Sequence, residues 1–347
     1  MAYTTIDDPS QYFQTTLYTG DGSSSNAITN AGNSDLQPDW IWGSLRDEDG
    51  GARFVFDSSR GTTKRLKTNA TTEEQVRSGV TAFNSDGFTV GSHSDSNLNT
   101  KSLVAWQWKA NGGTTTSTNA SGSTGDNTDI IASVRQTNTT AGFSIITYTG
   151  DSTAGKKVTH GLGATPEFII IKNRDNGSEP WAVFTTPTGV KALALNTTAA
   201  QATDSGYWSD TNPDSTHFTV GSHGSTGAAA AFVAYAFTSI QGYSKFGSYT
   251  GNGNADGPFV YTGFKPAWIM IKRSDNAEGW HILDNKRDFN ENNTRLQAET
   301  TGVEDTSENG LDMLSNGFKI RTSWAGHNAS GGTYIYMTFA EHPFVSS

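Results

Sequence analysis

The sequence predicts an all-β protein made of three tandem antiparallel β-sandwich modules of about 100 residues each. The main observation is a block that recurs three times with its landmarks in the same order. The second is a composition rich in Gly, Ser, Thr and Asn, which suits short strands joined by turns rather than long helices. Repetition of whole modules is more typical of a binding or structural protein than of an enzyme, whose active site is usually assembled once.

Each block opens with a turn, continues through a proline-led aromatic-aliphatic strand and closes on a strand of alternating aromatic residues. The turns are Tyr18-Thr19-Gly20, Tyr148-Thr149-Gly150 and Tyr249-Thr250-Gly251, and the prolines are Pro38, Pro166 and Pro266. In the closing strands we expect Trp106, Tyr235 and Tyr336 to fill equivalent core positions. Their alternation predicts a sheet with one buried face.

These landmarks divide the chain into an N-terminal arm, three modules and a linker. The arm covers residues 1–11, the modules cover residues 12–110, 129–240 and 241–347, and the linker covers residues 111–128. The linker is a Gly/Ser/Thr/Asn tract that buries too little to order itself, so we expect module 1 to be more independent than modules 2 and 3. A short helix is expected at residues 71–79, because Glu73 and Glu74 near its start and Arg77 near its end suit the helix dipole.

Composition argues against several classes of partner. The net charge of -10 disfavours a nucleic-acid-binding groove. The absence of Cys excludes disulfides and thiolate metal sites. No apolar run approaches the roughly 18 residues of a membrane span, and the first residues lack the basic and apolar regions of a secretory signal. We therefore expect neither a nucleic-acid partner nor membrane insertion.

The polar motifs predict structural roles rather than catalysis. A glycan-cleaving enzyme needs a pair of carboxylates, but the acidic residues 47–49 and 304–305 lie in polar loops without counterparts in the other modules. The first loop could also hold Ca²⁺, although it lacks the full calcium-loop pattern. Two matched motifs, Asp57 to Arg60 and Asp284 to Arg287, are expected to lock turns through ion pairs. We predict no catalytic residues, no metal and no cofactor.

Several phrases resemble a recurrent module of marine tailed-phage virion proteins, of the cyanophage and pelagiphage kind, found in tail-fibre and appendage proteins. They include IDDPSQYFQTTLYTG, LQPDWIWGSLRD, FNSDGFTVGS and VTHGLGATPEFIIIKNRD. The resemblance covers nearly the whole chain and is densest over the first two modules. It implies a virion protein that is made in the host cytoplasm and exposed on the exterior of the particle, with other virion proteins as partners.

Two groups of residues are candidates for binding. Aromatic residues in polar loops could stack on sugars of a host surface glycan or could pack their own loops; they are Tyr207, Trp208, Trp181, Trp280 and Trp324. The arm has too few apolar residues to fold alone, so we expect another chain to order it, with docking through Asp7, Asp8 and Pro9.

The sequence therefore favours a non-enzymatic virion structural or accessory protein, such as a tail fibre, an appendage or a capsid decoration, present as a homo-oligomer on the particle. A host-receptor adhesin that binds cell-surface glycans is the alternative. A glycan depolymerase ranks third, because the carboxylate pair is missing.

Overall fold

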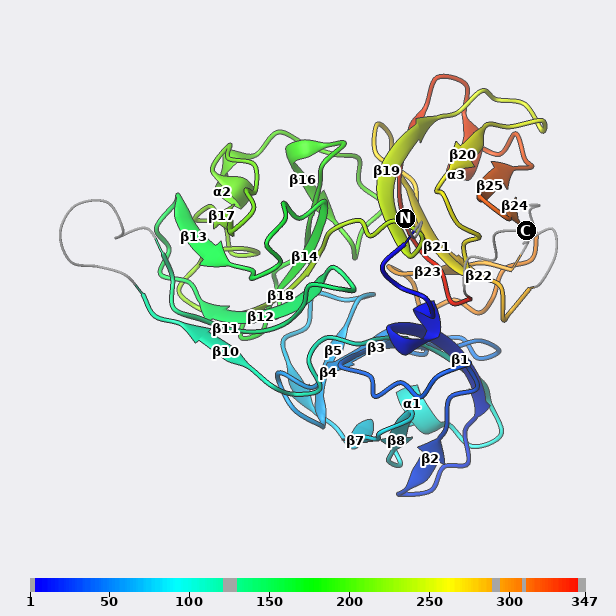
Figure 1. Cartoon of the computed structure of the whole chain (residues 1–347), viewed down its shortest axis with the longest axis horizontal. Coiled ribbons are helices and arrows are strands. Elements are labelled where there is room, and N and C mark those ends of the chain that lie inside the picture. Colours follow the sequence, from blue (N-terminus) through cyan, green and yellow to red (C-terminus); the bar gives the residue numbers. More distant parts are fainter. Residues whose placement is uncertain (1–3, 121–129, 289–293, 308–309, 343–347) are drawn as a thin grey trace.

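The computed structural model is all-β with several antiparallel sheets, as the sequence predicts. It describes residues 4–120, 130–288, 294–307 and 310–342. Three large sheets each pack against one small sheet, and we call each such combination a sheet pair. Figure 1 shows the three sheet pairs arranged around a common centre.

The first sheet pair follows the N-terminal 3₁₀ helix η1 (Pro9–Gln11). Its large sheet contains, in spatial order, β1 (Phe13–Thr19), β9 (Ser102–Trp108), β3 (Trp40–Leu45), β4 (Phe54–Asp57), β5 (Lys64–Lys67) and β6 (Gln75–Val76). Its small sheet contains β2 (Asn26–Ile28), β8 (Phe88–Val90) and β7 (Val80–Phe83), and α1 (Ser94–Asn97) precedes β9.

The second sheet pair has the widest large sheet. Its strands in spatial order are β10 (Thr116–Thr118), β11 (Ser133–Asn138), β12 (Phe143–Thr149), β18 (Ala231–Phe237), β14 (Phe168–Asn173), β15 (Ala182–Thr185) and β16 (Gly189–Ala194). The small sheet contains β13 (Lys156–Thr159) and β17 (His217–Val220), and α2 (Ser205–Trp208) lies between β16 and β17 in the chain.

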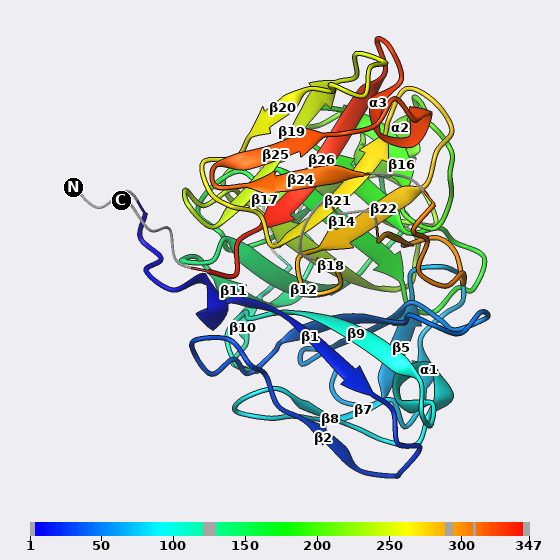
Figure 2. The same cartoon turned by 90° about the vertical axis from the view of Figure 1, so that its right-hand side faces the viewer.

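The third sheet pair completes the described chain. Its large sheet contains β19 (Ser244–Thr250), β26 (Thr333–Phe339), β21 (Trp268–Arg273), β22 (Trp280–Asp284) and β23 (Leu296–Gln297). Its small sheet contains β20 (Phe259–Tyr261), β25 (Gly317–Ile320) and β24 (Leu311–Leu314), and α3 (Ala325–Asn328) precedes β26. Figure 2 shows this small sheet on the outside of the molecule.

Strand registers repeat between the sheet pairs. Trp40 lies opposite Trp108, Phe168 opposite Phe237, and Trp268 opposite Phe339. Two residues earlier in each closing strand, the corresponding residues are Trp106, Tyr235 and Met337. The expectation for Tyr336 is therefore wrong by one position, because its side chain belongs to the opposite face of β26.

The three opening turns are built alike. The hydroxyls of Tyr18, Tyr148 and Tyr249 each donate to a backbone carbonyl 78 residues further on, in Ser96, Thr226 and His327. The glycine two residues later approaches another backbone: a Cβ on Gly20, Gly150 or Gly251 would lie 2.2 to 2.3 Å from a carbonyl oxygen. These turns therefore require glycine for close packing.

The hydrophobic core has a central part and three peripheral parts. Each sheet pair encloses its own cluster of apolar side chains between its two sheets. The outer faces of the three large sheets meet in one further cluster, to which Trp40, Trp106, Tyr235, Trp268 and Phe339 all belong. Both faces of each closing strand are thus buried, not one, and the expected independence of the first module is wrong because its tryptophans fill the shared core.

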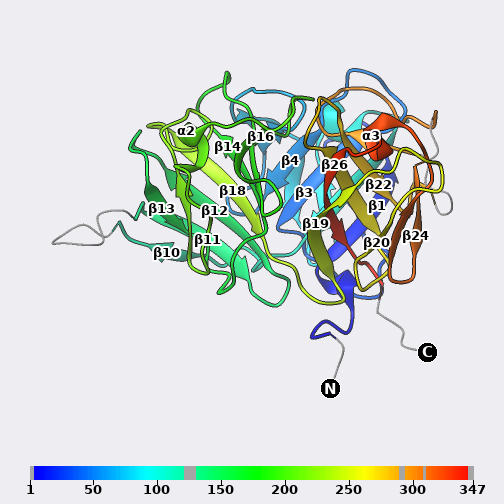
Figure 3. The ribbon, with the colours of Figure 1, turned by 90° about the horizontal axis from the view of Figure 1, so that it is seen from above.

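Two local predictions also need correction. Residues 111–120 do not form a free linker, because β10 pairs with β11 and the Asp39 carboxylate accepts the backbone N–H groups of Ala110, Gly112 and Gly113; residues 121–128 of the predicted linker lie outside the described residues. Residues 71–79 contain the short strand β6 and no helix. Figure 3 shows β10 and β11 at the side of the molecule away from the third sheet pair.

Candidate functional site

Three equivalent hydrogen bonds join the sheet pairs into a closed ring. Each donor side chain lies at the start of β15, β22 or β4, and each acceptor is the backbone carbonyl oxygen of the last residue of β5, β16 or β23 in the preceding sheet pair. The contacts are Trp181 Nε1 to Lys67 O at 2.8 Å, Trp280 Nε1 to Ala194 O at 3.0 Å, and Arg53 Nε to Gln297 O at 2.9 Å. The third contact returns to the first sheet pair, so the arrangement closes on itself.

A charged cluster fills the junction between the first and second sheet pairs. Arg60 forms an ion pair with Asp57, and both side chains are fully buried. Tyr235 of the second sheet pair donates its hydroxyl to Asp57 Oδ2 at 2.6 Å. Arg60 Nη1 also contacts Glu74 at 3.0 Å, and Glu74 accepts two hydrogen bonds from Arg174 at 2.9 and 3.0 Å. The motif therefore locks a turn, as predicted, and also joins two sheet pairs.

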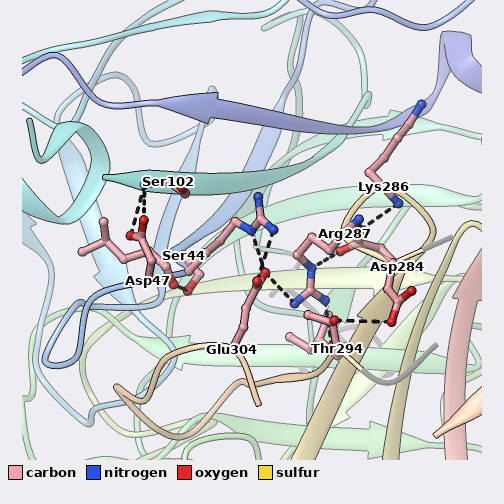
Figure 4. Close-up of polar contacts among 12 residues, drawn as sticks. Ser44, Asp47, Ser102, Asp284, Lys286, Arg287, Thr294 and Glu304 are labelled. Carbon is pink, nitrogen blue, oxygen red and sulfur yellow. Dashed lines mark hydrogen bonds and ion pairs between the residues drawn. The ribbon is translucent and has the colours of Figure 1, made fainter. Parts of the chain in front are cut away.

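The junction between the third and first sheet pairs repeats this cluster. Arg287 pairs with Asp284 at 2.6 Å, again with both side chains fully buried. Trp106 of the first sheet pair donates Nε1 to Asp284 Oδ2 at 2.9 Å. Glu304 lies between Arg287 Nη1, at 3.4 Å, and the guanidinium of Arg46, at 2.6 and 3.1 Å. Figure 4 shows Asp284, Arg287 and Glu304 along this chain of contacts.

The remaining junction, between the second and third sheet pairs, is neutral at every corresponding position. Thr185 and Thr188 replace the Asp and Arg, and their hydroxyls lie 2.9 Å apart. Gln201 replaces the glutamate. Its backbone N–H donates to Ser274 O, just as the backbone N–H groups of Glu74 and Glu304 donate to Arg174 O and Arg46 O. Met337 replaces the aromatic donor. The aspartate and the aromatic residue that donates a hydrogen bond to it are thus both replaced in this junction, as expected for two groups that contact one another.

The junction between the first and second sheet pairs favours the ionised form of Glu74. Burial alone would raise the pKa of Glu74, but the hydrogen bonds from Arg174 and the charge of Arg60 lower it below its ordinary value. A carboxylate held by two arginines from two sheet pairs joins those sheet pairs. Arg46 and Arg174 were missed from the sequence, although each stands at the same offset after its matched proline, Pro38 or Pro166.

Two buried lysines also serve the fold. Lys172 Nζ donates to Glu179 O at 3.0 Å, and Lys272 Nζ donates to Glu278 O at 2.8 Å and to Thr198 O at 3.1 Å. Burial lowers the pKa of both to about 8. A lysine with a lowered pKa can mark a reactive site, but here the backbone carbonyls occupy the donors.

Most of the predicted glycan-binding aromatics are buried. Trp181, Trp208 and Trp280 are at most 1 % exposed, and Tyr207 is 8 % exposed and stacks on His223 with ring centroids 4.2 Å apart. They pack the core and junctions, so their proposed role as exposed platforms is wrong. Trp324 is half-buried, and the guanidinium of Arg295 lies 4.4 Å from its ring centroid.

The described part of the N-terminal arm is ordered by its own chain. Ile6 is 2 % exposed and belongs to the central core, and Pro9 is buried. Asp8 accepts hydrogen bonds from Ser10 and from the Ser34 hydroxyl, the latter at 2.7 Å. The expectation that another chain must order residues 4–11 is therefore wrong. Asp7 is exposed, and docking through it stays a prediction.

The acidic loops come together without forming a free carboxylate pair. Asp49 accepts the N–H of Val303 at 3.1 Å, which brings residues 47–49 beside residues 302–305. Asp47 accepts the N–H of Ser102, Glu48 pairs with Lys101, and Asp305 pairs with Arg295. In the described ranges no group of three or more His, Asp or Glu side chains is placed to hold a metal ion.

An open groove of about 380 Å³ lies at the edge of the second large sheet. Hydroxyl side chains of β10, β11 and β12 line it, together with Val134 and Arg174. Such a surface offers hydrogen bonds, and the hydroxyl of its one tyrosine, Tyr148, already donates to Thr226 O at 2.6 Å. Arg174 is already paired with Glu74.

Fold and contacts together define the class: an all-β protein whose buried charges are used to join repeated sheets. Residues 8–343 match the family described as "Domain of unknown function (DUF7483)", and the chain belongs to that family. No curated protein and no solved structure matches the chain. None of the helices in the described part of the chain has the length and apolar character that a membrane span requires.

Proposed function

We propose that this chain is a non-enzymatic structural or accessory protein of a bacteriophage particle, exposed on its exterior as a tail fibre, an appendage or a capsid decoration. We further propose that the three sheet pairs are three tandem copies of one antiparallel β-sandwich module. The closed ring of three equivalent hydrogen bonds between the sheet pairs is the observation that carries the proposal. Two of the three junctions use buried ionisable groups, such as Asp57 and Asp284, for assembly rather than for chemistry.

The fused architecture suits an exposed particle protein. Because the three sheet pairs share one core, the unfolding of one sheet pair would destabilise the others. The chain contains no Cys, so its stability does not depend on disulfides or on an oxidising compartment. The phrases that resemble marine phage modules supply the particle context. Other virion proteins are the proposed partners, with several copies of this chain on each particle.

A proteomic inventory of purified particles tests the proposal. The chain should be present at a reproducible copy number per particle, and gold-labelled antibody against it should bind intact virions. Abundance in the infected-cell lysate with absence from purified particles would contradict the proposal. Attachment is tested with Asp7→Ala, since deleting residues 1–11 would also remove Ile6 from the core.

The alternative, a receptor adhesin, requires aromatic rings that face solvent. Phe259 and Tyr261 meet this requirement, because they are 45 % and 60 % exposed. Labelling of whole host cells by the purified protein would favour the adhesin, and release of reducing ends from host polysaccharide would instead identify a depolymerase.

A further inference from the structure

The outer face of the third small sheet carries exposed aromatic residues. Val260 points inward to the core of the third sheet pair, so its neighbours Phe259 and Tyr261 point outward from β20. Leu314 on β24 is 40 % exposed, beside the aromatic residues at 45 % and 60 %. Most large apolar side chains of the described chain are buried, so three exposed together on one small sheet mark a distinct surface.

Strand register places these residues side by side. Tyr261 lies opposite Gly317, and Gly317 lies opposite Leu314. A Cβ on Gly317 would lie 2.9 Å from Phe259 Cζ, so the phenyl ring leans over the glycine. Phe259, Tyr261 and Leu314 thus surround a position without a side chain, and Lys319 lies beside them, opposite Phe259. We call this surface the aromatic face.

Two ion pairs lie beside the aromatic rings on the same face of the small sheet, because Lys319 lies opposite Phe259 and Asp312 lies opposite Lys319. Lys319 Nζ lies 2.7 Å from Asp256, and Arg321 Nε lies 2.5 Å from Asp312. Asp256 and Arg321 have side chains 82 % and 50 % exposed, so their donors and acceptors remain open to solvent. Two positive and two negative groups thus balance beside the aromatic rings. A neutral polyhydroxylated ligand fits such a surface better than a polyanion, which would also face the net charge of -10.

The fold itself does not require aromatics at these positions. Val260 pairs with Phe318 as Ile28 pairs with Phe88 and Val158 pairs with Phe218. The residues flanking Ile28 and Val158 are Ala27 with Thr29, and Lys157 with Thr159. At these positions of the three small sheets, the aromatic pair therefore occurs only in the third.

We propose that the aromatic face binds a neutral glycan of a cell surface. The rings of Phe259 and Tyr261 stack on the apolar faces of pyranose units, and the ion pairs beside them hydrogen-bond the hydroxyl groups. Residues two apart on a strand are separated by roughly 6.5 to 7 Å, so that the two rings contact one sugar or two adjacent sugars. This proposal holds whether or not the chain is part of a particle, so its test is independent of the particle inventory.

Affinity electrophoresis of the full chain in native gels tests the proposal. The gels contain laminarin, yeast mannan, dextran or galactan as neutral probes, and alginate as the anionic probe. At least one neutral polysaccharide should retard the protein, and alginate should not. Retardation by none of the neutral probes, or by alginate alone, would overturn the proposal.

Variants assign the binding to the face. Replacing both aromatics, with Phe259→Ala and Tyr261→Ala, should raise the dissociation constant about tenfold or more. Lys157→Ala, at the position that corresponds to Phe259, is the matched control and should leave retardation unchanged. Both variants should keep the unfolding midpoint of the parent, because the replaced side chains face solvent. Equal retardation of the double variant and the parent would overturn the assignment.

A second copy of the chain is the competing occupant. Sedimentation equilibrium of the parent and of the double variant distinguishes it from a glycan. The glycan proposal predicts the same mass for both proteins. A parent dimer that the double variant loses would assign the aromatic face to self-association instead.

Discussion

The indole N–H of Trp106 donates to Oδ2 of Asp284 across 2.9 Å, and the hydroxyl of Tyr235 donates to Oδ2 of Asp57 across 2.6 Å. Both pairs are separated by 178 residues, but one runs forward along the chain and the other runs back. One geometry is thus used twice around the ring. The contact from Trp106 to Asp284 brings the third sheet pair against the first.

Trp106 should be among the residues whose truncation is most costly. Trp106→Ala removes a fully buried ring from the central core and should lower the free energy of unfolding by about 3 to 5 kcal/mol. Trp106→Phe keeps most of the ring but leaves Asp284 without one donor, and should cost about 1 to 3 kcal/mol. Urea unfolding followed by tryptophan fluorescence measures both. A loss under about 1 kcal/mol for the alanine variant would show that the ring is not buried.

The charged and neutral junctions should respond differently to truncation. Asp57→Ala leaves the Arg60 guanidinium buried without its main carboxylate and should cost about 3 to 5 kcal/mol. Thr185→Ala, at the corresponding position of the neutral junction, removes only a hydroxyl contact and should cost about 1 kcal/mol. The two variants are compared by urea unfolding at one pH. Equal losses would mean that Asp57 does not carry the junction.

The opening turns should tolerate no side chain at their glycine. Gly150→Ala places Cβ 2.3 Å from the carbonyl oxygen of Ala228 and should cost about 1 to 3 kcal/mol. Gly302→Ala is the control, because the nearest atom to its Cβ is 3.8 Å away. Thermal unfolding of both variants checks the prediction. If the Gly150→Ala protein were as stable as the control, Gly150 would not lie in close contact with the backbone of Ala228.

Stability should also depend on Glu299. Burial raises the pKa of its carboxyl group to about 7, although the N–H of Trp280 and the charges of Lys272 and Arg53 act in the opposite direction. The folded state therefore binds a proton that the unfolded state releases near its ordinary pKa of 4.5. This contribution to stability is complete below pH 4.5 and is lost as the pH rises through about 7.

Glu299→Gln provides the measurement. Glutamine resembles the protonated carboxyl group, so the variant should match the parent near pH 4.5 and be more stable than the parent at pH 8. Urea unfolding at the two pH values gives the comparison. A variant that is less stable than the parent at pH 8 would show that ionised Glu299 is accommodated in the folded state.

Local features were predictable from the sequence because they depend on near neighbours. The three opening turns follow from the Tyr-Thr-Gly spacing, and the pairs Asp57–Arg60 and Asp284–Arg287 follow from a separation of three residues across a turn.

The closed ring was not predictable, because it depends on the relative orientation of the three large sheets. The alternation of Trp106 and Trp108 indicates a buried face, but it does not say whether the partner is the small sheet or two other large sheets. The helix expected at residues 71–79 fails for a related reason: Glu74 is needed between Arg60 and Arg174, which lie far apart in the sequence. The aromatic face was overlooked although Phe259, Val260 and Tyr261 alternate in the strand pattern.

Differential scanning calorimetry of the full chain tests the central claim, that three sheet pairs share one core and unfold together. The account predicts one endotherm whose calorimetric enthalpy equals its van't Hoff enthalpy, as for a single cooperative unit. Two or three separable transitions, one of which is reproduced by a fragment covering residues 1–120, would contradict it. In that case the sheet pairs would be independent domains, and the junctions of Asp57 and Asp284 would not hold them together.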